Sequence, residues 1–333
     1  MREGHDWALV LAGGQGKRMQ HLTRIGSGVS VPKQFCSLGR GPSLLNQALL
    51  RARSVAPPER ILISLTEAHR CWWTGISESL PADNILVQPG QRGTGIGILH
   101  ALLEILHRDP QASLVILPSD HFFRNEAGVA VGLCEALEIT RIHPERVLLL
   151  GFEPDEPDPD LGYILPGEAY GQALFSVRAF TEKPGTEAAR ALLKQGALTN
   201  SFIVAANGHA LLEIFERQWP EVVAPLRDCL AACGDPATRV DDLAHLFAAI
   251  PSVDFSGQVL ANNLRTLAVL RVAPCGWSDL GTPARLERVL HHNRAAIESM
   301  PPSPAAMRGQ LDLAERSDSG EPARDNSASS LRS

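Results

Sequence analysis

Short apolar runs alternate with amphipathic stretches through the first half of the chain. The apolar runs, each bounded by Gly, Pro or Asp, predict buried strands at residues 7–11, 61–65, 85–87, 114–117 and 147–151. Apolar residues at helical spacing predict helices between them at residues 44–53, 96–107 and 127–140. Strand-then-helix alternation is typical of a parallel sheet with helices on both faces, so the pattern predicts an α/β, Rossmann-like fold.

The second half of the chain has a less regular pattern. Residues 155–160 (DEPDPD) predict an acidic, proline-rich loop that no helix crosses. Further strands are expected at residues 173–181, 201–205 and 267–272, and helices at residues 187–195, 210–217, 221–232 and 283–297. Residues 301–333 are rich in Ser, Pro, Ala and charge, which predicts a disordered tail after one domain at residues 1–300.

Composition and charge narrow the class of protein. With 44% hydrophobic residues among 333, the chain can bury a large core. The 31 Lys and Arg against 37 Asp and Glu leave a net charge of −6, which excludes the basic excess of a nucleic-acid binder. No apolar run reaches about 18 residues, and Glu3 and Asp6 oppose a signal peptide, so we expect a cytoplasmic protein with no membrane span and reduced cysteines.

A glycine-rich segment, LAGGQGKRM at residues 11–19, directly follows the first predicted strand. Glycines there let backbone N–H groups approach a phosphate, and Lys17 and Arg18 add positive charge. The segment is not a P-loop, because Arg18 stands where Ser or Thr is required, and it is not a dinucleotide fingerprint, because Met19 is large. If the glycines are considered alone, an ordinary glycine-rich turn explains them as well as a phosphate-binding loop does.

Further motifs follow this segment in a fixed order. They are PKQF (32–35), QPGQRGTGIGI (88–98), LPSDH (117–121), LGYI (161–164), FTEKP (180–184), TNSF (199–202), SVDF (252–255) and GWSDLG (276–281). Together with LAGGQGKRM they resemble the motifs of the sugar nucleotidyltransferases, or nucleoside-diphosphate-sugar pyrophosphorylases. PKQF resembles the mannose-1-phosphate guanylyltransferase branch in particular, and the resemblance covers nearly the whole chain before the tail.

The resemblance implies a fold and a reaction. The fold is a mixed, mainly parallel sheet flanked by helices, of the nucleotide-diphospho-sugar transferase type, with a nucleotide half at about residues 1–150 and a sugar-phosphate half at about 151–300. The reaction is in-line attack of mannose 1-phosphate on the α-phosphorus of GTP, which forms GDP-mannose and expels pyrophosphate. Positioning and charge neutralisation dominate such chemistry.

The family motifs place charged groups on particular residues. Asp120 and Asp279 match the metal positions, and two carboxylates suffice for Mg²⁺, the expected cofactor. The alternative for Asp120 is an N-cap of the next helix. Arg18 is expected to stabilise pyrophosphate, Lys33 to face the nucleotide phosphates and Lys183 to face the sugar phosphate.

The remaining site residues are also carried over from the resemblance. The expected nucleotide-binding residues are Leu11, Ala12, Gly13, Gly14, Gly16, Gln88 and Thr94. The expected sugar-phosphate-binding residues are Gly162, Glu182, Lys183, Asn200 and Asp254. Asn200 alone could equally be a turn residue before a strand.

Departures from the family motifs leave alternatives open. Gly93 and Ile96 replace the Asn and Pro of R-N-T-A-P, which leaves the base open, and Phe202 replaces a glycine, which could reshape the sugar pocket. The same chemistry with UTP, dTTP or CTP and a hexose 1-phosphate such as glucose 1-phosphate remains an alternative. A non-catalytic regulator that binds sugar nucleotides is another, and a homodimer is a further hypothesis.

Overall fold

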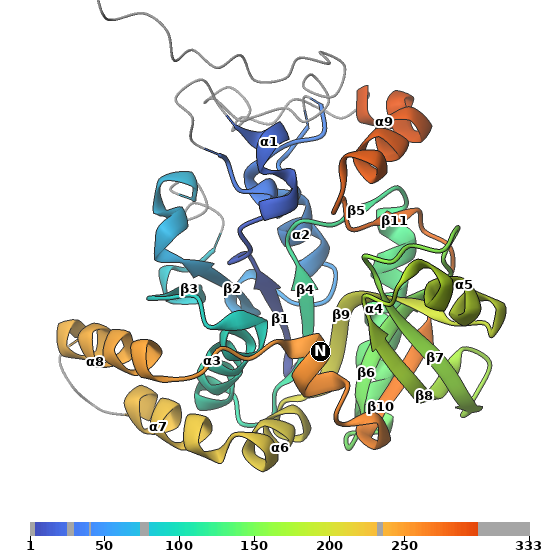
Figure 1. The fold of residues 1–333 in the computed structure, drawn as a ribbon. Helices are drawn as coiled ribbons and strands as arrows, with labels where there is room; N and C mark the ends of the chain where they lie inside the picture. Colours follow the sequence, from blue (N-terminus) through green and yellow to red (C-terminus); the bar gives the residue numbers. More distant parts are fainter. Residues whose placement is uncertain (1–3, 25–29, 40, 74–79, 232–235, 299–333) are drawn as a thin grey trace, which may run out of the picture.

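The computed structural model describes residues 4–298 except 25–29, 40, 74–79 and 232–235 (Figure 1). In these residues nine strands form one sheet, in the order β3-β2-β1-β4-β9-β6-β10-β8-β7. The strands are β1 Asp6–Leu11, β2 Ile61–Thr66, β3 Ile85–Gln88, β4 Ser113–Pro118, β6 Val147–Phe152, β7 Gly162–Ala169, β8 Leu174–Glu182, β9 Leu198–Asn207 and β10 Leu267–Arg271. The predicted tail at 301–333 lies outside the described residues.

The sheet is mixed and mainly parallel, as predicted. β1 runs parallel to β2 and β4, β2 to β3, and β6 to β10. β9 is antiparallel to β4, β6 and β7, while β8 pairs antiparallel with β10 and β7. The carboxyl ends of β1 and β4 therefore meet at one edge of the sheet, where ligands bind in such folds.

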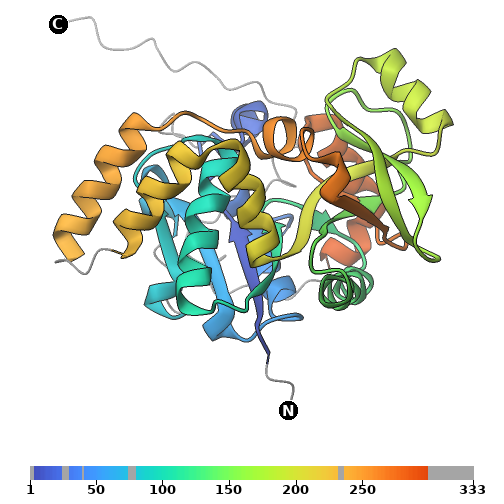
Figure 2. The same ribbon diagram turned by 90° about the horizontal axis from the view of Figure 1, so that it is seen from below.

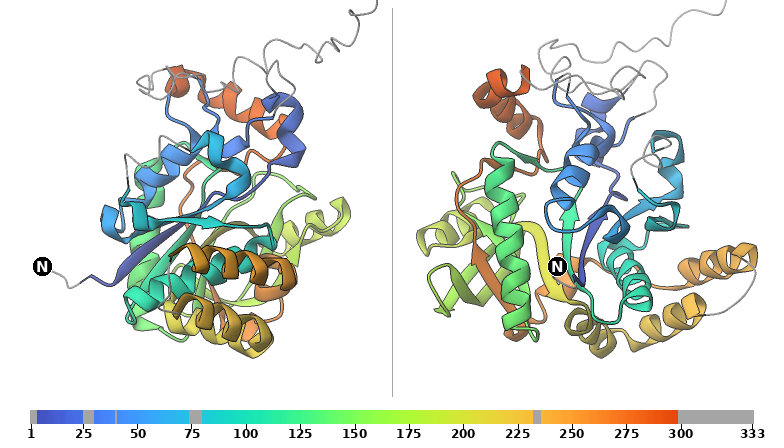
Figure 3. Two further views of the ribbon diagram at one scale, coloured as in Figure 1. Left: turned by 90° about the vertical axis from the view of Figure 1, so that its left-hand side faces the viewer. Right: turned by 180° about the vertical axis from the view of Figure 1, so that it is seen from behind.

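Helices cover both faces of the sheet. Those described are α1 Gln20–Thr23, α2 Leu44–Ala52, α3 Gly93–Arg108, α4 Glu126–Ile142, α5 Thr186–Lys194, α6 Gly208–Gln218, α7 Pro220–Ala231, α8 Pro236–Ala249 and α9 Pro283–Glu298. One apolar core contains the buried residues of α2 and α4, and a second contains those of α3, α6 and α7. Figure 3 shows α2 and α4 in front of the sheet when the molecule is seen from behind, and Figure 1 shows α3 and α6 on the other face.

Two of the longer elements, β7 and α8, were not predicted, and neither were the short helix α1 and the two-residue strands β5 (Phe122–Phe123) and β11 (Trp277–Ser278). β7 (GYILPGEA) contains two glycines and a proline, and it forms because β8 and β9 both supply partners for its backbone. α8 packs against α7, beside which it lies in Figure 2. Its Leu243, Leu246 and Phe247 lie at helical spacing and join the second apolar core, while most of its other described side chains are exposed. β7 depends on partner strands that the local pattern does not reveal, whereas the apolar spacing of α8 was a local signal that the sequence analysis missed.

Some predicted positions need correction. β4 ends at Pro118, so Asp120 lies two residues beyond the strand. The next helix, α4, is capped by Asn125, whose side chain accepts from the Gly128 N–H, so the N-cap interpretation of Asp120 is wrong. Asn200 lies inside β9, and the turn before a strand is likewise wrong.

The described part of the chain contains no helix with both the length and the hydropathy needed to cross a bilayer.

Candidate active site

One cavity of about 440 Å³ opens at the edge of the sheet where β1 and β4 end. Most of the predicted site residues line it: Leu11, Gly14, Gly16, Arg18, Lys33, Thr94, Asp120, Gly162, Glu182, Lys183, Asn200, Asp254 and Asp279. Ala12, Gly13 and Gln88 do not line it. Residues separated by up to 268 positions thus surround a single space.

The glycine loop after β1 is held from below by Gln34. Its amide, which is buried, donates to the carbonyls of Ala12 and Gly14 at 2.9 and 3.0 Å. Gly16 adopts a left-handed φ of 56°, and a Cβ there would lie 3.3 Å from Lys33 Cβ. The loop conformation therefore depends on glycine and on the PKQF segment together.

The two candidate metal carboxylates are brought together by a small second sheet. β5 (Phe122–Phe123) pairs antiparallel with β11 (Trp277–Ser278), and Phe122 lies opposite Ser278. Because Asp120 precedes β5 and Asp279 follows β11, this register places both carboxylates at the same end of the pair. Their association is a consequence of strand pairing between segments 159 residues apart.

Lys33 joins the same two segments. Its buried ammonium lies 2.8 Å from Asp120 Oδ2 and donates to the carbonyls of Asp279 and Leu280 at 2.5 and 3.3 Å. Burial raises the pKa of Asp120, but the charge and hydrogen bond of Lys33, together with smaller effects of His121 and the backbone, hold the pKa below its usual range. Asp120 is therefore ionised at neutral pH, as a cation ligand must be. A contact between Lys33 and nucleotide phosphates remains a prediction.

His121 is a neutral imidazole beside Asp120. Burial lowers the pKa of His121 to about 4, despite the nearby carboxylates of Asp120 and Asp279. Trp277 Nε1 lies 3.1 Å from His121 Nδ1, and an indole N–H can only donate. His121 therefore carries its proton on Nε2, which lies 3.8 Å from Asp120 Oδ1.

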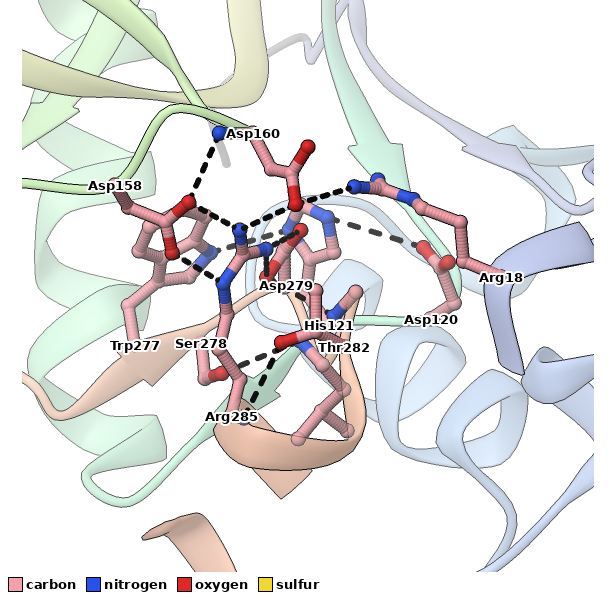
Figure 4. Close-up of polar contacts among 12 residues, drawn as sticks. Arg18, Asp120, His121, Asp158, Asp160, Trp277, Ser278, Asp279, Thr282 and Arg285 are labelled. Carbon is pink, nitrogen blue, oxygen red and sulfur yellow. Dashed lines mark hydrogen bonds and ion pairs between the residues drawn. The ribbon is translucent and has the colours of Figure 1, made fainter. Parts of the chain in front are cut away.

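Asp279 forms a salt bridge with a buried arginine, Arg285, at the start of α9. Arg285 Nη1 lies 2.6 Å from both carboxylate oxygens of Asp279, and the other side of the guanidinium bonds to Asp158 at 2.7 Å (Figure 4). Asp160, from the same acidic loop as Asp158, lies 3.4 Å from Arg18. The sequence analysis assigned no function to this loop or to Arg285.

The predicted sugar-phosphate residues come from β7, β8 and β9. Gly162 leaves room for Glu182, because a Cβ at Gly162 would lie 2.6 Å from Glu182 Oε2. Burial raises the pKa of Glu182 although the neighbouring Lys183 opposes this, with its ammonium 3.4 Å away. Asn200 is buried, and its Oδ1 accepts from the Phe202 N–H at 3.1 Å. Phe202 itself lines the cavity, as its replacement of a glycine suggested.

Asp254 has a structural task besides its place at the cavity. Its Oδ1 accepts from the Gly257 N–H at 2.6 Å and so caps the π-helix Phe255–Leu260. One carboxylate oxygen is therefore engaged before any sugar binds. The predicted sugar contact of Asp254 can involve the remaining acceptor capacity.

Thr94 lies in the first turn of α3, and Gln88 is the last residue of β3. Thr94 lines the cavity, and its hydroxyl accepts from the Phe255 N–H at 3.0 Å. Gln88 is buried beneath the glycine loop and donates to Ser64 Oγ at 2.8 Å. Gln88 thus lies beside Gly13 and Gly97 and outside the cavity lining, and its contact with a base stays a prediction.

The donors in the cavity suit a hard divalent cation. Asp120 and Asp279 are carboxylates that keep acceptor capacity beyond their present hydrogen bonds, and Mg²⁺ needs only one or two such ligands besides phosphate and water. The described lining carries five carboxylates (Asp120, Asp160, Glu182, Asp254 and Asp279) against three basic side chains (Arg18, Lys33 and Lys183). A triphosphate entering this cavity therefore requires additional positive charge.

Comparison with known proteins agrees with this arrangement. A sequence model described as "Nucleotidyl transferase" matches residues 7–294, which is most of the chain. The chain belongs to the nucleotidyl transferase family. This confirms the resemblance found in its motifs.

Curated relatives extend the comparison to named enzymes. Mannose-1-phosphate guanylyltransferase ManC of Salmonella typhimurium is 28% identical over 307 residues, covering 88% of this chain and 61% of the relative. Xanthan biosynthesis protein XanB of Xanthomonas campestris pv. campestris is 28% identical over 281 residues, covering 82% and 57%. This nucleotidyltransferase chain thus spans about three-fifths of the length of these relatives.

Solved structures support the same fold. A mannose-1-phosphate geranyltransferase from Thermus thermophilus, as it is named, matches with a TM-score of 0.74 and 27% identity over 86% of this chain and 79% of that one. A UDP-glucose pyrophosphorylase matches with a TM-score of 0.56 at 13% identity, over 87% of this chain and 99% of that one, which is a likeness of fold alone. The predicted nucleotide-diphospho-sugar transferase type of fold is thereby confirmed.

Proposed function

We propose that this nucleotidyltransferase is a Mg²⁺-dependent mannose-1-phosphate guanylyltransferase that forms GDP-mannose and pyrophosphate from GTP and mannose 1-phosphate. The observation that carries the proposal is that the glycine loop, the carboxylates of Asp120 and Asp279 and the polar residues of β7, β8 and β9 all line one cavity. The choice of nucleotide and sugar comes from relatives named mannose-1-phosphate guanylyltransferase.

The reaction needs positioning more than covalent help from the protein. An oxygen of the sugar phosphate attacks the α-phosphorus of the nucleotide, a new P–O bond forms, and the bond to the β-phosphate oxygen breaks to release pyrophosphate. Asp120 and Asp279 would hold Mg²⁺, which supplies positive charge to the reacting phosphates. Arg18 lies at the glycine loop, where it can bind the leaving pyrophosphate, and Lys183 can bind the sugar phosphate.

The sugar would be oriented by the group around Glu182. Asn200 and Glu182 present an amide and a carboxylate to the cavity, and both are at least partly buried. A buried acceptor left without its hydroxyl partner penalises an analogue that lacks that hydroxyl. Selectivity for one hexose phosphate is therefore expected to depend on Glu182 and Asn200.

The test is pyrophosphate release from mannose 1-phosphate and Mg²⁺ with GTP, ATP, UTP, CTP and dTTP in turn. Asp120→Asn removes the charge of one cavity carboxylate, and we expect a loss of about 10²-fold or more. Asp155→Asn is the matched control, because Asp155 is exposed and lies outside the cavity lining. Its activity should match the wild type.

The outcomes separate the alternatives. Release mainly with GTP, lost in Asp120→Asn and kept in Asp155→Asn, supports the proposal. Release mainly with UTP, dTTP or CTP, or only with another hexose 1-phosphate, keeps the transfer chemistry and overturns the substrate pair. Calorimetric binding of GDP-mannose without release from any pair would indicate a non-catalytic regulator instead.

A further inference from the structure

Arg285 connects two loops that meet at the cavity. It lies in the first turn of α9, and its side chain is only 8% exposed. Nε and Nη2 donate to the two carboxylate oxygens of Asp158, and Nη1 donates to both oxygens of Asp279 (Figure 4). One planar guanidinium is thus fixed between two carboxylates.

The position of Asp158, the second partner of Arg285, is fixed by hydrogen bonds to its own backbone. The hydroxyl of the buried Tyr163 accepts from the Asp158 N–H at 2.8 Å and donates to the Asp158 carbonyl at 2.9 Å. Burial raises the pKa of Asp158, but its bonds to Arg285 hold the pKa below the usual range. Asp158 therefore has a fixed backbone and a charged side chain at neutral pH.

The backbone near Asp279 is shaped around the same contact. A Cβ at Gly281 would crowd both Asp279 Oδ2 and Arg285 Nη1, so a side chain there would displace this pair. The Gly281 N–H donates to Asp279 Oδ1 at 3.1 Å, and Leu280 between them has a left-handed φ of 49°. The backbone therefore includes a strained Leu280 and a glycine at 281 where Asp279 pairs with Arg285.

We propose that Arg285 is the positioning residue of the cation site, holding the carboxylate of Asp279 toward the cavity by bridging it to Asp158. The inference rests on the proposed function, because Asp279 is one of the two carboxylates assigned to the cation. Metal-ligating carboxylates are oriented by partners behind them, and loss of such a partner typically costs about 10–100-fold in metal affinity. One guanidinium between two carboxylates also leaves a net negative charge that attracts a cation.

The geometry requires arginine and not positive charge alone. A lysine keeps the charge but is a point donor that cannot bond both carboxylates with a fixed planar fork. Arg288 provides a matched control on the same helix. It bonds to Glu156 of the same acidic loop, is about half exposed and does not line the cavity, so it ties α9 to the loop without touching Asp279.

The experiment measures cation binding without turnover. Free Mn²⁺ is followed by electron paramagnetic resonance as it is titrated into wild type, Arg285→Lys, Arg285→Met and Arg288→Lys, with thermal melting to check folding. We expect the two Arg285 variants to bind Mn²⁺ about 10–100-fold more weakly. Arg288→Lys should stay within about two-fold of wild type, as surface substitutions usually do.

A second readout is the Mg²⁺ dependence of pyrophosphate release. Arg285→Lys should need more Mg²⁺ for half-maximal rate and recover most of kcat at high Mg²⁺, with the KM for sugar phosphate unchanged. Wild-type affinity in a folded Arg285→Lys, or an equal loss in Arg288→Lys, would overturn the inference. If Arg285→Met does not fold, Arg285→Lys decides.

Failure of the inference and failure of the proposed function give different results. Wild-type protein that releases pyrophosphate and binds Mn²⁺, with Arg285→Lys indistinguishable from it, overturns the inference alone. Wild-type protein that neither releases pyrophosphate nor binds millimolar Mn²⁺ overturns both. Release without Mn²⁺ binding removes the cation from Asp120 and Asp279, and the inference with it.

Discussion

Three residues other than glycine adopt left-handed backbone angles, among the residues that the structure describes. They are Lys183, Phe202 and Leu280, with φ of 48°, 61° and 49°. Lys183 and Phe202 line the cavity, and Leu280 lies between Asp279 and Gly281, which do so too. This conformation costs an L-residue roughly 1–2 kcal/mol, and such costs gather where a site over-determines the backbone. The strain of this protein is therefore concentrated at its candidate active site.

Phe202 allows that strain to be measured. Its ring packs on Phe255 with centroids 5.9 Å apart, so any small substitution loses that packing. Phe202→Gly and Phe202→Ala lose the ring equally, but only glycine tolerates a φ of 61° freely. We expect Phe202→Gly to be more stable than Phe202→Ala by about 1 kcal/mol in urea unfolding. An alanine variant as stable as the glycine variant would show that the left-handed conformation carries no cost here.

His121 links stability to pH. In the folded chain its pKa is about 4, whereas an unfolded histidine titrates near 6.5, so between these values the unfolded chain binds more protons. Stability should therefore fall as the pH is lowered through this window, by about 2 kcal/mol from pH 7 to pH 5. Urea unfolding at both pH values checks this, and His121→Gln should flatten the slope. His291→Gln, at an exposed histidine of α9, should leave the slope as it is in the wild type.

At the scale of elements, the start of α3 explains why the RGTGIG segment, residues 92–97, contains three glycines. Gly93 has a φ of 80°, and a Cβ on it would lie 2.2 Å from the Val253 carbonyl oxygen. The Gly95 N–H donates to that same oxygen at 2.8 Å. The glycines of RGTGIG thus let the first turn of α3 contact the segment that carries Asp254. The region of Thr94 and the region of Asp254 are therefore held together by direct backbone contact.

A glycine pair in this loop tests the close approach. Gly93→Ala should destabilise the protein by about 2–3 kcal/mol, because it adds both a backbone clash and a strained φ. Gly90→Ala is the matched control three residues earlier, since a Cβ there meets nothing within 4 Å and its φ is not left-handed. Thermal or urea unfolding compares the two. Equal stability of both variants would contradict the contact with Val253.

At the scale of the whole molecule, negative charge predominates both in the chain and at the cavity. The chain carries a net charge of −6, and the described cavity lining also has more carboxylates than basic groups. A triphosphate would therefore enter a region that repels it. Long-range attraction cannot bring the nucleotide in unless a cation accompanies it.

This leads to a prediction about ligand-induced stability. GTP with EDTA should raise the melting temperature little, whereas GTP with Mg²⁺ should raise it clearly. A ligand at 100 times its Kd adds about 2.7 kcal/mol of stability to the folded state. Thermal melting under both conditions checks this, with Mg²⁺ alone as the control. An equal shift with GTP in EDTA would contradict a cation-dependent nucleotide site.

Local sequence pattern was sufficient for most elements. The predicted strands at 7–11, 61–65 and 114–117 match β1, β2 and β4 closely, and the predicted helices at 44–53, 96–107 and 127–140 match α2, α3 and α4. Apolar periodicity is a local property, so it can be read along the chain without knowledge of partners. β7 was missed because its partner strands β8 and β9 stabilise it, and α8 was missed although Leu243, Leu246 and Phe247 lie at helical spacing.

The sequence by itself determined the family, the parallel half of the sheet and many of the residues that surround the cavity. Only the tertiary structure decided that β9 enters between β4 and β6, and that β5 pairs with β11 to bring Asp120 beside Asp279. It also decided that Arg285 bridges Asp158 and Asp279 and that Trp277 fixes the tautomer of His121. These contacts join segments far apart in the sequence or depend on how a helix docks. Side-chain partners of that kind are set by packing, which no local pattern contains.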